Sequence, residues 1–243
     1  MTARLRADRL LVERGLFESR TKAQAAIAAG RVTADEKPVR KASDEINANA
    51  RLQAEPAFPW VSRGGVKLAY ALDQTGFKID GRICLDAGAS TGGFTEVLIA
   101  RGALRVYAVD VGRDQLHPRL RGHPNIVSFE ETDIRALDRA HIDRAPDIIV
   151  ADVSFISLKH VLPAALKLAA PHVHLLALVK PQFEAPRHHI KKGIVRDPAV
   201  HSAIVEDLTK FIASLGCEVL MTFPSPIEGG DGNREFFIGA YRG

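Results

Sequence analysis

The stretch Leu85-Asp86-Ala87-Gly88-Ala89-Ser90-Thr91-Gly92-Gly93-Phe94 decides the fold of this chain. A short apolar run leads into it, and residues 94–100, which follow, have apolar side chains at helical spacing. We therefore predict a strand that ends at Asp86, a tight glycine turn, and a helix that starts near Gly93. A ligand can approach the backbone of such a turn closely, beside the positive end of the helix dipole. A glycine turn without a ligand, in any doubly wound domain, is the alternative.

Residues around the turn indicate the class of ligand. Asp110 ends the next apolar run, where an acidic side chain can hold the ribose hydroxyls of a nucleotide-like ligand. The spacing of the glycines at 88, 92 and 93 is not the G-x-G-x-x-G of dinucleotide sites, which disfavours a nicotinamide oxidoreductase. A carboxylate at Asp86 suits a ligand with a cationic amino group better than a pyrophosphate. We therefore predict S-adenosylmethionine (SAM) as the cofactor, and a titration with NADH against SAM separates the two hypotheses.

The predicted cofactor site combines the turn with the ends of neighbouring strands. Asp133 follows the third predicted strand, and it either binds the amino group of an adenine or caps the helix that follows. The predicted cofactor-binding residues are Asp86, Gly88, Ser90, Thr91, Gly92, Gly93, Phe94, Asp110 and Asp133.

Length and composition bound the rest of the interpretation. A chain of 243 residues, 46% hydrophobic and 26% charged, can hold one α/β domain and a small additional module. The net charge of +4 is compatible with an anionic partner but does not identify one. Cys84 and Cys217 lie in apolar runs, which predicts buried thiols, and neither they nor the nine histidines have ligand spacing, so we expect no metal. Neither a signal peptide nor a membrane span is visible, which predicts a cytoplasmic protein without a membrane partner.

Residues 1–60 differ in pattern from the rest of the chain. Apolar spacing predicts a first helix that stops at Gly15 and a second that begins after Ser19 and stops at Gly30. A polar turn at 35–37 separates two short runs and predicts a hairpin, with a further short strand at 51–53. Basic side chains are scattered over this unit, and a solvated surface accounts for them as well as an anionic partner does.

This order of helix, helix and hairpin resembles the ribosomal-protein-S-four type of RNA-binding domain. The resemblance rests on Asp8-Arg9-Leu10-Leu11, Ser19-Arg20, Gly30-Arg31-Val32 and Lys41-Ala42-Ser43. It implies that the second helix and the hairpin present basic residues to structured RNA. The RNA contacts that it implies are Arg20, Lys22, Arg31 and Lys41.

A linker separates this unit from the remainder. Two prolines stiffen Pro56-Ala57-Phe58-Pro59-Trp60, so we predict a linker at 55–61 and domains at 1–58 and 59–243. The run Ser62-Arg63-Gly64-Gly65-Val66-Lys67 then leads into a predicted helix at 68–75. Lys67 falls in the first turn of this helix, where the dipole disfavours a cation, so helix stability does not explain it.

From residue 82 onward, short apolar strands alternate with longer amphipathic helices, which predicts a mostly parallel sheet. The predicted strands lie near 83–86, 105–110, 125–129, 147–151, 173–179, 217–223 and 235–241, and the predicted helices at 92–101, 158–169 and 199–214. The predicted fold is α/β, a Rossmann-like seven-stranded domain with a SAM site, preceded by a small α+β domain for which the resemblance above implies RNA binding.

Polar residues stand at three of these strand ends. Asp152 and Lys180 each follow an apolar strand, and Glu235 stands at the start of the last one. Ligands of open α/β sheets bind at the carboxyl ends of parallel strands. If the last strand runs antiparallel, its beginning lies at that same edge. A lysine between two carboxylates can be a structural ion pair, but three such residues beside a predicted cofactor site favour chemistry.

Together with Lys67, these residues resemble the Lys-Asp-Lys-Glu tetrad of the heat-shock-type (FtsJ-like) ribose 2′-O-methyltransferases. More narrowly, residues 62–68, 86–95, 151–158, 179–184 and 193–198 resemble the TlyA, or haemolysin-A, family. This resemblance implies SAM-dependent 2′-O-methylation of cytidine ribose in ribosomal RNA, with the RNA or a ribosomal subunit as partner. The implied catalytic residues are Lys67, Asp152, Lys180 and Glu235. The chain stops directly after its last strand, as in the family's shorter subtype, which favours large-subunit over small-subunit RNA.

The tetrad would act on a ribose hydroxyl, which is a poor nucleophile until its proton is removed or strongly hydrogen-bonded. We expect Lys180 to contact this hydroxyl, as a base if neutral or as a positioning group if charged. Asp152 and Glu235 favour the charged form, so orientation is the stronger hypothesis. Holding both reactants in line supplies much of the acceleration.

A second basic stretch follows Lys180 closely. Residues 187–196 carry four fixed positive charges and no acid. We expect a mobile loop that grips RNA phosphates near the active site, with Lys191, Lys192 and also Arg63 as contacts. A solvated loop is the alternative.

Three classes of function remain open. The first is a ribosomal RNA ribose methyltransferase. The second is an RNA-binding or ribosome-assembly factor that holds SAM without turnover, against which the complete tetrad argues. The third is a cytolysin, as the family's historical name suggests, and the sequence contains neither a membrane span nor a strongly amphipathic basic helix to support it. The oligomeric state is not indicated.

Overall fold

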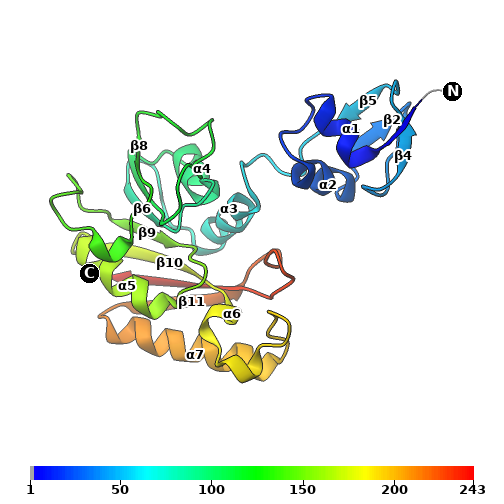
Figure 1. The fold of residues 1–243 in the computed structure, drawn as a ribbon. Helices are drawn as coiled ribbons and strands as arrows, with labels where there is room; N and C mark the ends of the chain where they lie inside the picture. The colour runs from blue at the N-terminus through cyan, green and yellow to red at the C-terminus, as the bar shows by residue number, and fades with distance from the viewer. Residues whose placement is uncertain (1–2) are drawn as a thin grey trace. The chain divides into compact units, whose positions relative to one another are not determined.

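The glycine turn joins a buried strand to a helix, as predicted, in the computed structural model, which describes residues 3–243. The strand β6 (Ile83–Ala87) ends before the turn, and the helix α4 (Gly93–Ala100) begins after it. The chain divides into two units, one up to Pro59 and one from Trp60 onward, and each has a hydrophobic core of its own (Figure 1).

The N-terminal unit combines a helix pair with short antiparallel strands. Its elements are β1 (Arg4–Arg6), α1 (Ala7–Glu13), α2 (Arg20–Ala28), β2 (Val32–Ala34), β3 (Lys37–Pro38), β4 (Glu45–Asn47) and β5 (Leu52–Ala54). β1 pairs with β4, and β2 lies between β3 and β5. Ser19 caps α2 by accepting a hydrogen bond from the backbone N–H of Lys22, as its position before the helix predicts. Alanines and aliphatic residues of both helices form the core together with β2.

The second unit is built on one seven-stranded sheet in the order β11-β12-β10-β9-β6-β7-β8. Besides β6, its strands are β7 (Arg105–Val109), β8 (Ile126–Phe129), β9 (Ile148–Ala151), β10 (Val173–Val179), β11 (Glu218–Pro224) and β12 (Phe236–Arg242). β12 runs antiparallel to both of its neighbours, and the other pairings are parallel. The α/β class and the seven-stranded sheet are therefore confirmed, including the antiparallel last strand.

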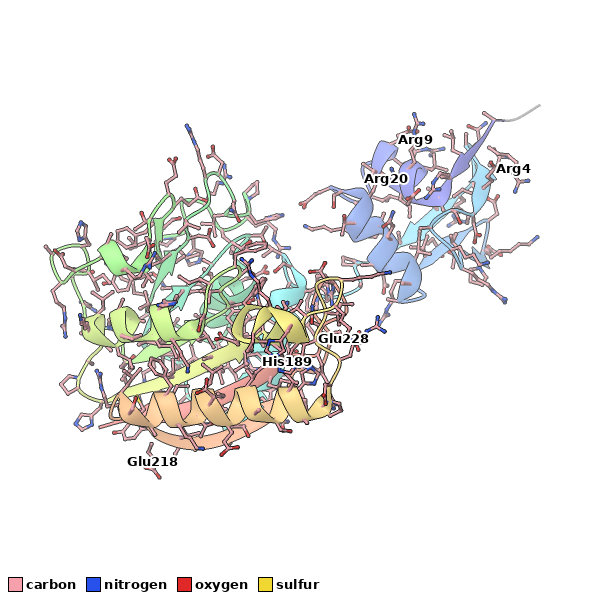
Figure 2. The ribbon with its side chains drawn as sticks, turned by 60° about the horizontal axis from the view of Figure 1, so that its bottom comes forward. Arg4, Arg9, Arg20, His189, Glu218 and Glu228 are labelled. Atoms are coloured by element: carbon pink, nitrogen blue, oxygen red, sulfur yellow. The ribbon has the colours of Figure 1, made fainter. Side chains whose placement is uncertain are left out.

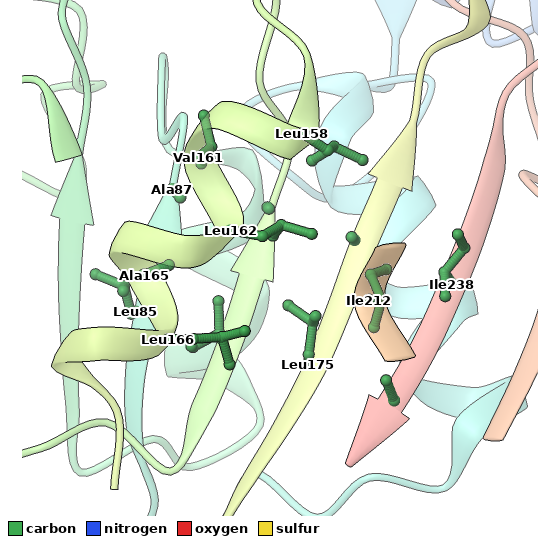
Figure 3. Packing of buried hydrophobic residues seen from close by; sticks show 14 of the residues in the cluster. Leu85, Ala87, Leu158, Val161, Leu162, Ala165, Leu166, Leu175, Ile212 and Ile238 are labelled. Carbon is green, nitrogen blue, oxygen red and sulfur yellow. The ribbon is translucent and has the colours of Figure 1, made fainter. Parts of the chain in front are cut away.

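Helices cover both faces of this sheet. Besides α4, they are α3 (Arg63–Thr75), α5 (Leu158–Leu168), α6 (Pro181–Glu184) and α7 (Pro198–Ser214), with short 3₁₀ turns at Ile134–Ala136 and Arg187–His189. α3 and α4 pack on one face, and α5 and α7 on the other. Figure 3 shows the apolar side chains of α5, from Leu158 to Leu166, lying over those of β6 and β10. These two layers hold the carboxyl ends of the parallel strands at one edge.

The structure differs from the sequence-based expectations in the start of one helix and in three short elements. The helix expected at 68–75 begins at Arg63, so Lys67 lies in its second turn rather than its first. The strands β1 and β4 and the helix α6 were not predicted. Cys84 and Cys217 are buried and free, as predicted. Within residues 3–243, no helix combines the length and the apolar character needed to cross a membrane.

Candidate active site

The sheet brings three predicted strand-end residues together. β9 and β10 are parallel neighbours, so Asp152 and Lys180, which follow them, leave the sheet at the same edge. β12 pairs antiparallel with β10 in a register that sets Phe236 opposite Val179. Glu235, just before Phe236, therefore emerges beside Lys180. The antiparallel last strand is what brings the start of β12 to this edge.

The tetrad forms two ion pairs. Lys180 Nζ lies 2.6 Å from Asp152 Oδ1 and also donates a hydrogen bond to Ser154 Oγ at 2.8 Å. Lys67, carried by α3, donates a hydrogen bond to Glu235 Oε2. The side chains of Lys67 and Glu235 are 9% and 2% exposed, whereas those of Lys180 and Asp152 are 12% and 19% exposed. The Lys180 pair is thus the one that a substrate reaches more readily.

Burial and charge act against each other at Glu235. Burial raises the pKa of this carboxyl group, and the neighbouring ammonium groups of Lys67 and Lys180 lower it. A buried carboxylate of this kind needs its cation, so Lys67 and Glu235 hold one another at this edge.

A cavity of about 320 Å³ lies between the glycine turn and the segment that follows β9. It is lined by residues of the turn, of the segment after β7, of the segment after β8 and of 152–156, among them Gly88, Ser90, Asp110, Asp133 and Asp152. Gly88 has φ +88°, and a Cβ there would stand 2.6 Å from the carbonyl oxygen of Asp152, so only glycine leaves this space open. A second hollow, of about 560 Å³, lies between α7 and β11, and its lining includes no member of the tetrad.

Asp110 organises the rim of the cavity. One carboxylate oxygen accepts a hydrogen bond from the backbone N–H of Ser90 at 2.8 Å, and the other accepts from that of Gly112 at 2.7 Å. The carboxylate therefore ties the turn to the loop after β7. It remains part of the cavity lining, where a hydroxyl-bearing ligand can reach it.

Asp86 is more deeply placed than a direct ligand contact requires. Its side chain has no exposed surface and is not part of the cavity lining. Oδ2 accepts a hydrogen bond from Thr95 Oγ1 at 2.6 Å, and Oδ1 has no hydrogen-bond partner among the described residues. Burial raises the pKa of Asp86 to about 7, opposed by the Thr95 hydroxyl, and the nearby Asp152 and Asp110 carboxylates raise it further. Three acidic side chains thus surround the turn, and Oδ1 of Asp86 has neither the hydrogen bond nor the ion pair that would satisfy it among the described residues.

The other predicted cofactor residues divide into two groups. Asp133 caps the 3₁₀ turn at Ile134–Ala136 and pairs with Arg135; it also lines the cavity, where its contact with an adenine stays a prediction. Thr91, Gly92, Gly93 and Phe94 are not among the lining residues. Thr91 is exposed, the two glycines are buried at the start of α4, and Phe94 belongs to the core, where its ring stacks on Phe237.

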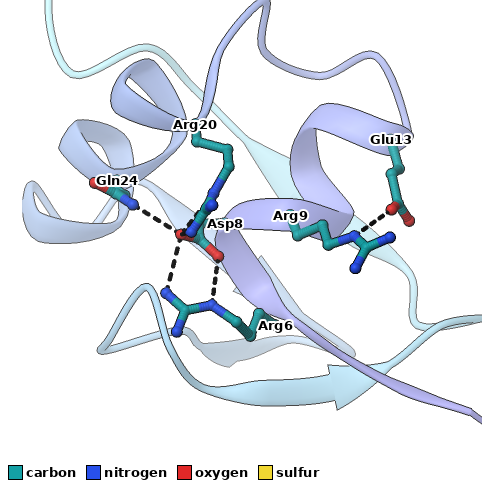
Figure 4. A network of polar contacts seen from close by, with 6 residues as sticks. All are labelled: Arg6, Asp8, Arg9, Glu13, Arg20 and Gln24. Atoms are coloured by element: carbon teal, nitrogen blue, oxygen red, sulfur yellow. Dashed lines mark hydrogen bonds and ion pairs between the residues drawn. The ribbon is translucent and has the colours of Figure 1, made fainter.

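The predicted RNA contacts of the N-terminal unit differ in their surroundings. Arg20, together with Arg6 and Gln24, donates hydrogen bonds to the carboxylate of Asp8 (Figure 4). Lys22 pairs with Glu18, Arg31 pairs with Glu55, and Lys41 is exposed. Figure 2 shows Arg4, Arg9 and Arg20 at the outside of this unit. Arg20 therefore serves the fold of the unit and is exposed as well.

The predicted contacts of the second unit lie on exposed segments. Arg63, the first residue of α3, donates to the carbonyl of Glu228. Lys191 and Lys192 are exposed in a tight turn that is closed by a bridge between Lys191 and Ile194. The buried side chain of Asn233 accepts from the N–H of Val195 and donates to the carbonyl of Gly193, so this segment is fixed next to the chain that leads to Glu235.

Sequence reasoning missed three residues at this edge. Ser154 holds Lys180, and Glu184 accepts hydrogen bonds from Ser157 and from the N–H of Leu158, which joins α6 to the start of α5. Phe155 has φ +66° and is 92% exposed beside the cavity, a strained backbone of the kind that clusters at functional sites. The two serines at 154 and 157, which interrupt the apolar residues after Asp152, were the available indication. Among residues 3–243, no group of three or more His, Cys, Asp or Glu side chains is arranged to hold a metal ion.

Comparisons with known proteins agree with this geometry. Residues 60–242 match the FtsJ-like methyltransferase family, and residues 5–52 match the S4 domain family. The 16S/23S rRNA (cytidine-2′-O)-methyltransferase TlyA of Mycobacterium tuberculosis is 42% identical over 98% of this chain and 90% of its own length. The 23S rRNA (cytidine-2′-O)-methyltransferase TlyA of Campylobacter jejuni is 38% identical over 73% of this chain and 69% of its own length. A solved structure named as a hemolysin, from Streptococcus thermophilus, has a TM-score of 0.78 and 38% identity, and the match covers 100% of this chain and 90% of that one.

Proposed function

The chain belongs to the FtsJ-like methyltransferase family, and we propose that it transfers a methyl group from SAM to the ribose 2′-hydroxyl of a cytidine in ribosomal RNA. One observation carries the proposal. Lys180, paired with Asp152 and followed across the sheet edge by the Lys67–Glu235 pair, stands next to a cavity bordered by a glycine turn and by acidic side chains.

The residues around the cavity fit SAM. Asp110 is available to the ribose hydroxyls, Gly88 leaves room for close approach, and Asp133 can receive the amino group of the adenine. Asp86, Asp110 and Asp152 together give this end of the cavity a negative field, which suits a ligand that carries a sulfonium and an ammonium group. The unpartnered Oδ1 of Asp86 is a further acceptor for that ammonium group through a bridging water, since the side chain is buried outside the cavity lining. When bound, SAM supplies a methyl group that is activated toward an oxygen nucleophile.

Lys180 is the residue that we assign to the ribose hydroxyl. Its ammonium group faces carboxylates on two sides, Asp152 in direct contact and Glu235 nearby, which suits a charged hydrogen-bond donor more than a neutral base. A donor fixed in this way orients the hydroxyl oxygen toward the cavity, and orientation alone lowers the barrier substantially. The buried Lys67–Glu235 pair acts indirectly, because it holds the Glu235 carboxylate next to Lys180.

We assign RNA binding to both parts of the chain, with residues 1–58 as the RNA-binding domain and residues 59–243 as the methyltransferase domain. The S4 match supports Arg20, Lys22, Arg31 and Lys41 as contacts to structured RNA. Exposure and charge support Arg63, Lys191 and Lys192 as phosphate contacts close to the tetrad. The names of both TlyA relatives include 23S rRNA, and one includes 16S rRNA, so we propose large-subunit RNA as the first substrate and small-subunit RNA as the second.

Transfer of labelled methyl groups from SAM to large subunits, small subunits and naked rRNA tests this function. We expect label in one of these RNAs, at the 2′-oxygen of a cytidine, and a loss of at least about 100-fold in Lys180→Ala. Lys167→Ala, an exposed lysine on α5, is the matched control and keeps the wild-type rate. SAM binding without label in any RNA supports a non-catalytic binding factor instead, and lysis of red cells by the purified protein supports the cytolysin.

A further inference from the structure

A serine hydroxyl stands between Lys180 and the cavity. Ser154 lines the cavity, and its Oγ accepts the hydrogen bond that Lys180 Nζ donates at 2.8 Å. It is therefore one of two groups through which the edge of the cavity contacts the lysine that we assign to the ribose hydroxyl. Asp152, the other partner of Lys180, also lines the cavity.

An ammonium group has three N–H donors on a flexible stem, so its direction depends on how many of them are held. Asp152 and Ser154 hold Lys180 from positions two residues apart on one segment. Ser154 engages one N–H by a hydrogen bond, and Asp152 restrains the ammonium group by an ion pair, so together they limit the directions of the remaining N–H groups. With Asp152 alone, the group can turn about a single contact while it keeps its ion pair.

The backbone next to Ser154 is strained. Phe155, the next residue, has φ +66°, a left-handed conformation that is costly for a phenylalanine. Ser154 itself is exposed, and its hydroxyl is not part of a buried network that the fold would need. A strained segment that presents an exposed hydroxyl to a lysine indicates a role in the chemistry of the site rather than in stability.

We propose that Ser154 is a positioning residue that, with Asp152, fixes the direction in which Lys180 presents its remaining N–H to the ribose hydroxyl. This inference rests on the proposed function, since it gives Lys180 the same task. The serine acts through the lysine, so its removal lowers turnover without weakening the binding of SAM.

Ser154→Ala, Ser154→Thr and Lys180→Ala are compared with Ser202→Ala, an exposed serine on α7, as the matched control. For Ser154→Ala we expect kcat to fall roughly tenfold to 100-fold, with KM for SAM and the melting temperature close to those of the wild type. Threonine retains the hydroxyl and restores most of kcat. NMR of the protein with labelled lysine, in which the Lys180 signal is identified by its absence from Lys180→Ala, reports a more mobile Lys180 side chain in Ser154→Ala only.

Wild-type kcat in Ser154→Ala overturns the inference if Lys180→Ala is inactive in the same assay. A rise in KM for SAM at unchanged kcat also overturns it, because the serine would then bind the cofactor. Full activity of Lys180→Ala removes the role proposed for the lysine and the inference with it. If the wild type labels no RNA, the proposed function fails, and the mobility of the Lys180 side chain alone decides whether Ser154 positions it.

Discussion

Asp8 and Asp86 are two carboxylates without exposed surface, one in each unit, and their surroundings are opposite in character. Asp8 accepts hydrogen bonds from Arg6, Arg20 and Gln24, which together use both of its oxygens (Figure 4). The hydrogen bond from Arg6 is the largest of the effects that lower its pKa well below the usual range. Asp8 is thus a satisfied anion that ties β1 and α1 to α2.

Asp86 has the same burial but little of this support. The Thr95 hydroxyl serves one oxygen, the other has no partner among the described residues, and its charged neighbours Asp110 and Asp152 are acids. Burial therefore raises its pKa to about 7. A buried group that is this poorly satisfied is typical of a binding or catalytic site, whereas a satisfied one is typical of a structural anchor. The comparison teaches that burial alone does not tell the two apart; the partners do.

Asp86→Asn should give the largest effect, and with opposite signs for stability and binding. Because the folded pKa is raised, the native state keeps a proton that the unfolded chain releases, so stability falls as the pH rises from about 4 to about 7. The amide removes this penalty, and we expect a gain of about 2 kcal/mol at pH ~8 and less than half of that at pH ~5. Affinity for SAM should fall at least about tenfold, since an amide does not attract an ammonium group.

Denaturant unfolding followed by the fluorescence of Trp60, the only tryptophan and a residue of the second unit, measures the stability change. Calorimetric titration with SAM measures the affinity. Thr95→Val is the control of opposite sign, because it removes the one partner of Asp86 and should destabilise most at high pH. If Asp86→Asn is no more stable at pH ~8 than the wild type, this would falsify the interpretation that Asp86 is a buried carboxylate without sufficient partners.

Asp8→Asn should give a smaller effect that lies in the N-terminal unit. The folded pKa is lowered, so the stability that Asp8 contributes is present above its unfolded pKa of 3.8 and is lost as the pH falls below it. We expect a loss of about 1–2 kcal/mol at neutral pH, because charge-assisted hydrogen bonds become neutral ones. Hydrogen exchange of the amides of α1 and α2 measures it.

Glu13→Gln is the matched control for Asp8→Asn. It breaks the pair between Arg9 and Glu13, whose side chains are 65% and 43% exposed, so its cost should stay within about 0.5 kcal/mol. Equal losses of stability in the two variants would mean that Asp8 does not anchor the N-terminal unit. The contrast between Asp8 and Asp86 would then not hold. Unchanged affinity for SAM in both is expected.

The sequence predicted the fold well because buried parallel strands appear as apolar runs and the glycine turn marks the join between β6 and α4. It did not predict where α3 begins. The helix was expected to begin at residue 68, after Gly64 and Gly65, but Gly65 lies inside it, where a Cβ would stand 2.4 Å from Trp60 Cβ. Gly65 leaves room for the Trp60 side chain, which precedes it by five residues, and apolar spacing does not reveal this close approach. Short pairings such as β1 with β4 are missed for a different reason, because they join residues 4–6 to the distant residues 45–47.

The candidate site was predictable to a similar depth. Ligands of open α/β sheets bind at the carboxyl ends of the strands, so the sequence alone predicted that Asp152, Lys180 and Glu235 lie close together. The burial of Asp86 and the hydrogen bond from Lys180 to Ser154 could not be predicted, because both depend on the exact conformation of the loops after the strands. Nor does a charge count reveal that Arg20 holds Asp8.

The comparison is sharpened furthest by Arg20→Ala and Lys41→Ala, for which we expect the smallest changes in stability. Arg20 holds the buried Asp8 carboxylate, so its loss should cost about 1 kcal/mol in the N-terminal unit as well as affinity for RNA. Lys41 is exposed and contributes its backbone N–H to Asp44, which alanine retains, so stability should change by less than about 0.5 kcal/mol.

Hydrogen exchange of α1 and α2 measures the stability of the unit, and fluorescence anisotropy on a labelled fragment of large-subunit RNA measures the affinity for RNA. We also expect Lys41→Ala to bind RNA more weakly. If this variant destabilised the unit as much as Arg20→Ala does, its weaker binding could be attributed to a loss of folding. Weaker binding at unchanged stability identifies Lys41 as a contact and leaves Arg20 with two roles, one toward Asp8 and one toward RNA.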